Sequence, residues 1–188
     1  IDVEIFASAG RVERVVMSQR KPQFLRIYSP EQALPAFGLS AADLLPGACI
    51  QTVSTGTPQL FIPLKNLDSL RRSQVDMQKF AALRQAGDFF SAHPFCLQGL
   101  ERGQTFARHF ALLPDIAEDP FTGSATGGMA AYLWHYGLIE SPTFIAEQGH
   151  WMQRPGLGFV EVVGARENIE TVKVGGGAVA VLRGELSL

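Results

Sequence analysis

Residues 120–139 read PFTGSATGGMAAYLWHYGLI, a stretch of twenty residues that contains no charged side chain. Its length alone would suit a membrane span, since a spanning helix needs about 20 apolar residues. Pro120, four glycines and several polar side chains make the stretch too polar and too broken for that role. A helix that is uncharged on every side is instead buried on every side within a protein core. We therefore predict no membrane span, and a buried helix over residues 124–136 that ends at Gly137 as its C-cap.

Strand-forming segments surround this helix in the sequence. Residues 3–6 and 12–17 flank Ser8-Ala9-Gly10, which is a hairpin signal within a strand-rich segment of 28 residues. Further strands are predicted at residues 50–63 (as a pair), 89–97, 105–112, 151–153, 158–163, 172–174, 178–182 and 185–188. The chain therefore has an α+β layout, in which an antiparallel or mixed sheet surrounds one apolar helix.

Two amphipathic helices are predicted outside this sheet. The first is short and begins after Ser29, because a serine cap is followed by Pro30 and Gln32 in the pattern of a capped helix start. The second lies within residues 68–87, where Asp76 can cap a helix with apolar residues at helical spacing. The expected apolar face consists of Met77, Phe80, Ala81 and Leu83.

Composition limits the classes of protein to consider. The chain has 188 residues, which fits one domain of ordinary size. Its net charge of −2 argues against a nucleic-acid partner. Two cysteines are too few for a disulfide framework or a four-ligand zinc site, and the four histidines have no metal-ligand spacing. We therefore expect no metal, reduced thiols, no signal peptide and a cytoplasmic protein.

The segment that opens the buried helix is the best candidate for a site. It reads EDPFTGSATGG, so that two carboxylates precede a glycine turn. The N-terminus of a helix has unpaired N–H groups and a partial positive charge. The amides of Gly123, Ser124 and Ala125 can therefore hold an anion such as a substrate carboxylate. Asp119 would stay ionised beside that charge and could exchange a proton with a bound carbon acid.

A plain helix cap is the alternative interpretation of these residues. In that case Thr122 or Ser124 caps the helix and Asp119 only complements the helix dipole. Separately, we expect Glu118 to be solvated rather than catalytic. Two other chemistries are disfavoured. The glycine spacing is not the dinucleotide-binding fingerprint, and Ser124 does not lie in a Gly-x-Ser-x-Gly elbow.

Four landmarks, in order along the chain, resemble one family. Residues 118–125 (EDPFTGSA) resemble the signature of the phenazine-biosynthesis isomerase-like family, which shares the diaminopimelate epimerase fold. Residues 53–58 (VSTGTP) resemble its strand–glycine loop, and residues 147–149 (EQG), with RP at 154–155, resemble its Glu-Gln-Gly…Arg-Pro segment. Residues 172–186 resemble its closing hairpin.

The resemblance implies a two-lobe architecture. Family members have two similar lobes, each a sheet rolled around a central helix, with the active site in the cleft between them. Residues 1–188 would then form the second lobe plus lead-in strands. The first-lobe motifs, among them a Ser-Glu-Thr-like segment with the catalytic glutamate, do not occur in this sequence. The first lobe is therefore expected in the same polypeptide or in a second chain, and a homodimer is compatible with the fold.

The resemblance also implies residue roles and a reaction. Asp119 matches the active-site aspartate of the family. The residues expected to bind the substrate carboxylate or line the cleft are Gly123, Ser124, Ala125, Thr55 and Gly56. The implied reaction is proton transfer without a cofactor, which isomerises a small cyclic carboxylic acid. The alternative from another class is a non-catalytic anion-binding or interaction domain that retains one epimerase-like lobe.

Overall fold

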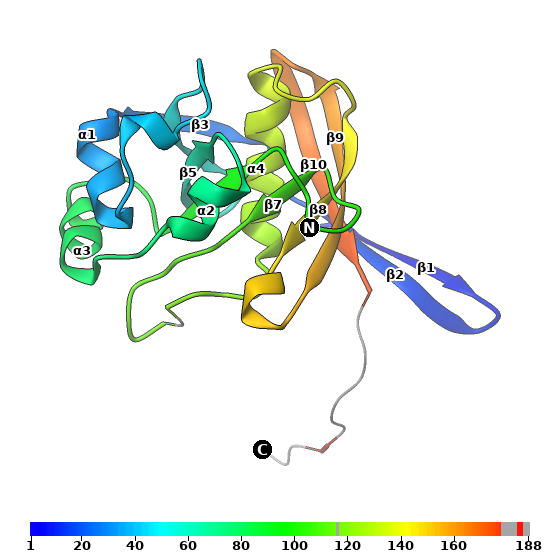
Figure 1. The fold of residues 1–188 in the computed structure, drawn as a ribbon. Coiled ribbons are helices and arrows are strands. Elements are labelled where there is room, and N and C mark those ends of the chain that lie inside the picture. Colours follow the sequence, from blue (N-terminus) through cyan, green and yellow to red (C-terminus); the bar gives the residue numbers. More distant parts are fainter. Residues whose placement is uncertain (116, 178–183, 186–188) are drawn as a thin grey trace.

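The computed structural model describes residues 1–115, 117–177 and 184–185, which form an α+β fold with one ten-stranded sheet (Figure 1). The strand order is β1-β2-β10-β9-β8-β7-β6-β5-β4-β3. The strands are β1 (Val3–Ser8), β2 (Arg11–Ser18), β3 (Gln23–Tyr28), β4 (Ile50–Ser54), β5 (Pro58–Leu64), β6 (Ser91–Cys96), β7 (Thr105–Ala107), β8 (Thr143–Gln148), β9 (Gly156–Ala165) and β10 (Asn168–Gly176). The helices are α1 (Pro30–Ala33), α2 (Leu67–Arg72), α3 (Met77–Gln85) and α4 (Gly123–His135), with 3₁₀ turns η1 (Leu34–Phe37), η2 (Ala41–Asp43) and η3 (His150–Met152).

The sheet is mixed and mostly antiparallel. β5 pairs with β6 in parallel, and so does β7 with β8, whereas the other neighbouring strands of the described residues run antiparallel. The sequence did not predict strand β8. The strand predicted at residues 151–153 is wrong. Residues 150–152 instead form η3, because Gly149 and Gln153 on either side of it have left-handed backbones with φ of 85° and 58°.

Helix α4 confirms the predicted buried helix. It spans Gly123–His135 and is buried continuously from Ala125 to Leu133. It contacts β4 and β5 near one end of the strand order and β9 and β10 nearer the other. The sheet therefore curves enough to bring strands from both halves to the same helix.

The other helices pack on the opposite face of β5. Along this strand Leu60, Ile62 and Leu64 face a core shared with α1, η1 and α3, whereas Phe61 faces α4. This alternation is the normal consequence of a pleated strand. In Figure 1, α1 and α3 lie at the left of the view and α4 lies nearer its centre.

The amphipathic stretch over residues 68–87 contains two helices, α2 and α3. Ser73 has a non-helical backbone and ends α2. The backbone N–H groups of Gln74 and Asp76 then donate to Phe37 and Ala36 of η1, at 2.9 Å each. Asp76 caps α3 as predicted. Of the expected apolar face, Phe80 is fully buried, Leu83 is half-buried, and Met77 and Ala81 are exposed.

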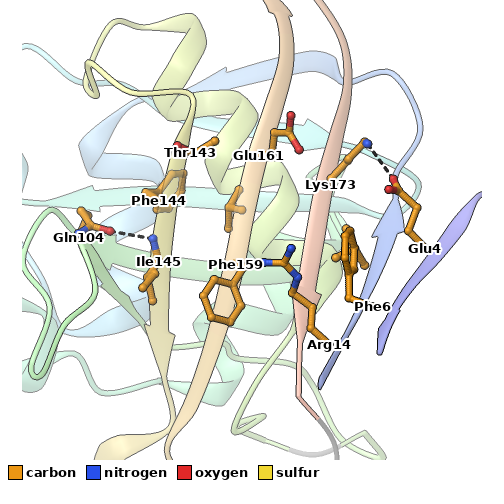
Figure 2. A pocket seen from close by; sticks show the side chains of 12 residues that line it. Glu4, Phe6, Arg14, Gln104, Thr143, Phe144, Ile145, Phe159, Glu161 and Lys173 are labelled. Atoms are coloured by element: carbon orange, nitrogen blue, oxygen red, sulfur yellow. Dashed lines mark hydrogen bonds and ion pairs between the residues drawn. The ribbon is translucent and has the colours of Figure 1, made fainter. Parts of the chain in front are cut away.

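The N-terminal hairpin forms as predicted and joins the sheet through β2. Its turn has positive φ at Ala9 and Gly10, which matches the twist of a two-residue hairpin. On the outer sheet face, side chains of β1, β2, β8, β9 and β10 line a cavity of about 430 Å³ (Figure 2). There Lys173 forms an ion pair with Glu4 at 2.7 Å, and Arg14 lies over the rings of Phe6 and Phe159. These contacts attach the hairpin to β9 and β10.

The closing hairpin is described only in part. β10 covers the predicted strand at residues 172–174, whereas most of the segment at residues 178–188 lies outside the described residues. Among the helices that the structure describes, none is long and apolar enough to cross a membrane.

Candidate active site

Asp119 lies in the loop that leads into α4, and the structure holds this loop on both sides. The backbone N–H of Asp119 donates to the carbonyl oxygen of His109 at 3.0 Å. Just before it, Glu118 accepts two hydrogen bonds of 2.8 Å from the guanidinium of Arg108. The hydroxyl of Thr122 donates to the carboxylate of Asp119. Asp119 is therefore a half-buried carboxylate with a defined place at the start of the buried helix.

The first turn of α4 has no side-chain cap. Thr122 occupies the N-cap position, but its side chain makes no hydrogen bond to the helix amides. Its hydroxyl is bound to Asp119 instead, and the hydroxyl of Ser124 accepts from Gln59 at 3.1 Å. The alternative interpretation, in which the side chain of Thr122 or Ser124 caps the helix, is therefore wrong. The amides of the first turn keep their capacity to bind an anion.

A network of amide and hydroxyl groups connects the turn after β4 to the start of α4. Thr55 donates its hydroxyl hydrogen to Oε1 of Gln19, and Nε2 of Gln19 donates to the carbonyl of Gly123 at 2.8 Å. Oγ1 of Thr55 also lies 3.5 Å from the carbonyl oxygen of Ser124. The structure thus brings Thr55 to the first turn of α4. Gln19 and Gln59 carry the connection, and no local sequence pattern indicates either residue.

A cavity of about 680 Å³ opens beside this turn. Gly123 and Phe121 line it at the entrance to α4, and Arg102 contributes a cation from the loop before β7. Gly123 is the predicted site residue among its lining residues. Ala125 is fully buried, and Gly56 is exposed at the tip of the β4–β5 turn with φ of 145°.

Two buried histidines lie behind Asp119. Nδ1 of His93 on β6 is 3.2 Å from Nδ1 of His109, which follows β7. Burial lowers the pKa of His93 well below its usual value. Burial also lowers the pKa of His109 to about 4, although the nearby carboxylate of Asp119 acts to raise it. The pair is therefore neutral at pH 7. The histidines look scattered in the sequence, and the β6–β7 pairing is what joins these two.

No group of three or more metal-ligating side chains occurs in the part of the chain that the structure describes.

The family model for phenazine biosynthesis-like proteins matches residues 3–184 of this sequence. The chain belongs to the phenazine biosynthesis-like family. An uncharacterized isomerase of Clostridium acetobutylicum is 32% identical over 183 residues, covering 93% of this chain and 61% of the relative. The trans-2,3-dihydro-3-hydroxyanthranilate isomerase of Pseudomonas fluorescens is 28% identical over 190 residues, covering 100% of this chain and 64% of the relative.

Solved structures of the family have the same fold. The PhzF-family phenazine biosynthesis protein of Bacillus anthracis superposes with a TM-score of 0.79 at 29% identity, over 93% of this chain and 60% of that one. A hydroxyproline epimerase of Agrobacterium vitis shares the fold alone, with a TM-score of 0.57 at 9% identity over 92% of this chain and 52% of that one. The chain spans about three fifths of the length of the family relatives that it matches.

The Glu-Gln-Gly segment of this family member supports the site from β8. Gln148 donates from Nε2 to the carbonyl of Asp119 at 2.6 Å and accepts at Oε1 from the backbone N–H of Thr122 at 3.2 Å. Position 149 needs a glycine, because the Cβ of any other residue would clash with the backbone oxygen of Pro120. Gln148 therefore fixes the backbone between the candidate catalytic carboxylate and α4. The family resemblance pointed to this segment in the sequence, but only the fold shows that the side-chain amide of Gln148 binds Asp119 and Thr122.

The carboxylate of Glu147 organises the loop that carries Arg102. It accepts hydrogen bonds from four successive backbone amides, those of residues 100–103, at 2.5–3.2 Å. Burial acts to raise the pKa of Glu147, but these amide hydrogen bonds outweigh it, and the pKa lies below its usual value. Glu147 is therefore an ionised structural residue.

Proposed function

We propose that this chain is the second lobe of an isomerase that moves a proton on a small cyclic carboxylic acid without a cofactor. The observation that carries the proposal is the carboxylate of Asp119, held by Thr122 at the uncapped N-terminus of α4. A family whose relatives include isomerases supports the reaction class.

In this mechanism the substrate carboxylate binds to the amides of Gly123, Ser124 and Ala125, where the partial positive charge of α4 stabilises it. The hydroxyl of Ser124 accepts from Gln59, so that its own hydrogen is available to the substrate. Asp119 then takes a proton from an activated carbon and returns a proton to another position. Thr55 and Gly56 provide the adjoining wall of the site.

The hairpin of β1 and β2 has an exposed apolar face, which is evidence for a contact with a first lobe. On this face β1 and β2 pair Val3 with Met17 and Ile5 with Val15, and all four side chains are exposed, Ile5 at 64%. A contiguous apolar surface of this kind indicates an interaction site. We propose that the first lobe, in the same polypeptide or in a second chain, packs here and supplies the second acid–base group. The described sheet would then close around α4 as the central helix of its own lobe.

Deuterium incorporation tests the reaction. The two-lobe protein is incubated in D₂O with trans-2,3-dihydro-3-hydroxyanthranilate, the compound in the name of the Pseudomonas fluorescens relative. We expect the compound to isomerise and to acquire deuterium on carbon, which NMR detects. Asp119→Asn should slow the exchange by about 100-fold or more, since general acid–base groups contribute about that much. Asp115→Asn changes an exposed carboxylate of the same loop and serves as the matched control.

Two results would oppose the proposal in different ways. If Asp119→Asn exchanges as fast as the unaltered protein, Asp119 is not the acid–base group. If the two-lobe protein binds cyclic carboxylic acids but none of them acquires deuterium, the non-catalytic anion-binding domain is the better description.

A further inference from the structure

A separate cavity of about 430 Å³ lies between α2 and η3. Its lining residues are Arg71, Arg108, His150, Trp151 and Gln153. Of these residues, Arg108 alone also contacts the loop before α4, through Glu118. The volume lies in the range of small-molecule pockets.

His150 is the first indication of a ligand. Its side chain is only 10% exposed, yet neither ring nitrogen has a hydrogen-bond partner. Oε1 of Glu101 lies 3.5 Å from Nε2 without making a hydrogen bond. Buried polar groups in proteins are nearly always hydrogen-bonded, so two unpartnered nitrogens on a residue that lines the cavity indicate a missing partner.

The charge in this cavity is the second indication. The guanidinium of Arg71 lies 5.3 Å from the centre of the Trp151 ring, and within the described chain Arg71 forms no ion pair. Arg108 is different, because Glu118 and the oxygens of Ser73 already occupy its guanidinium. Arg71 therefore leaves one uncompensated positive charge against an aromatic wall.

The backbone is the third indication. Gln153 is a non-glycine residue with a left-handed φ of 58°, and its N–H donates to the carbonyl of His150 at 3.1 Å. Such conformations are costly and gather at ligand sites. This turn places the side chain of Gln153 in the wall of the cavity.

We propose that this cavity binds the oxyanion group, a phosphate or a carboxylate, of a small molecule. Arg71 supplies the charge, while His150 and the Gln153 amide supply N–H donors. Trp151 lines the side against which the rest of the molecule packs. Glu101, whose side chain is 60% exposed, turns towards solvent when the anion binds.

Calorimetric titration tests the proposal on the unmodified protein with inorganic phosphate and, separately, with benzoate. We expect at least one of the two anions to bind, and Arg71→Gln to raise its Kd by about tenfold or more. Arg84→Gln is the matched control, because Arg84 also lies over an aromatic ring, that of Phe90 at 4.6 Å, but outside the cavity. Its Kd should equal that of the unaltered protein.

Two further variants separate the sites and the donors. Ser124→Ala should leave the Arg71-dependent binding unchanged, because it alters only the site at α4. His150→Phe keeps a ring but removes both nitrogens, and it should weaken binding as Arg71→Gln does. If His150→Phe does not fold, the exposed Arg71 still decides the question. If only phosphate binds, the ligand carries a phosphoryl group. If only benzoate binds, the ligand is an aromatic acid. No binding of either anion, or equal binding by Arg71→Gln, overturns the proposal.

Discussion

The buried histidine pair makes stability depend on pH in a window that carboxylates do not share. The pKa of His109 falls from 6.5 to about 4 on folding because of burial. At about 1.4 kcal/mol per pH unit, this difference corresponds to about 3 kcal/mol of unfolding free energy. Between pH 6.5 and 4 the unfolded chain binds more protons than the folded one. The free energy of unfolding should therefore fall as the pH falls through this window, and His93 should add to the loss.

Urea unfolding between pH 7.5 and 4.5, followed by tryptophan fluorescence, measures this dependence. Carboxylates whose pKa lies below its usual value, such as Asp43 at about 2, lose their contribution mainly below pH 4. His109→Phe should flatten the profile because it removes one titrating ring, whereas His135→Gln, an exposed position, should not change it. Equal stability at pH 7.5 and 4.5, or a variant His109→Phe profile as steep as the original, would refute the reasoning.

Three substitutions test the site and its supports. Ser124→Ala should weaken binding of the cyclic carboxylate to the two-lobe protein by about 1–3 kcal/mol, and calorimetry that gives equal affinity would exclude a contact. Gly128→Ala should cost about 1–3 kcal/mol in urea unfolding, because the added Cβ would lie 2.6 Å from Cζ of the fully buried Phe61; an unchanged midpoint contradicts this packing. Glu147→Gln should cost about 3 kcal/mol, since its NH₂ group would face backbone donors; full stability would mean that the loop at residues 100–103 has other support.

Local patterns predicted the elements whose cause is local. The capping box at Ser29, the Asp76 cap, the turn at Ala9-Gly10 and the buried helix all follow from residues within a few positions of one another. In each case the hydrogen bond or the steric preference that forms the element joins near neighbours in the chain.

Features that depend on distant partners could not be predicted in this way. Strand β8 pairs in parallel with β7, which is about forty residues earlier in the sequence, as well as with the following β9, and its own hydrophobic pattern is too short to indicate a strand. Glu118, expected to be solvated, is half-buried because Arg108 binds it across the loop. The His93–His109 pair and the hydrogen bonds from the Gln148 amide to Asp119 and Thr122 likewise depend on which strands are neighbours.

The two glycines in the middle of α4 show how fold and site are connected. Glycine inside a helix costs about 1 kcal/mol relative to alanine, so Gly127 and Gly128 need a reason. At Gly128 the ring of Phe61 fills the space of a side chain, and at Gly127 the amide of Gln19 does so. That same amide binds the carbonyl of Gly123 and the hydroxyl of Thr55. A side chain at Gly127 would displace Gln19, and the first turn of α4 would lose its connection to the β4–β5 turn. The glycines that make the helix look weak in sequence therefore let the sheet approach it closely enough to build the site.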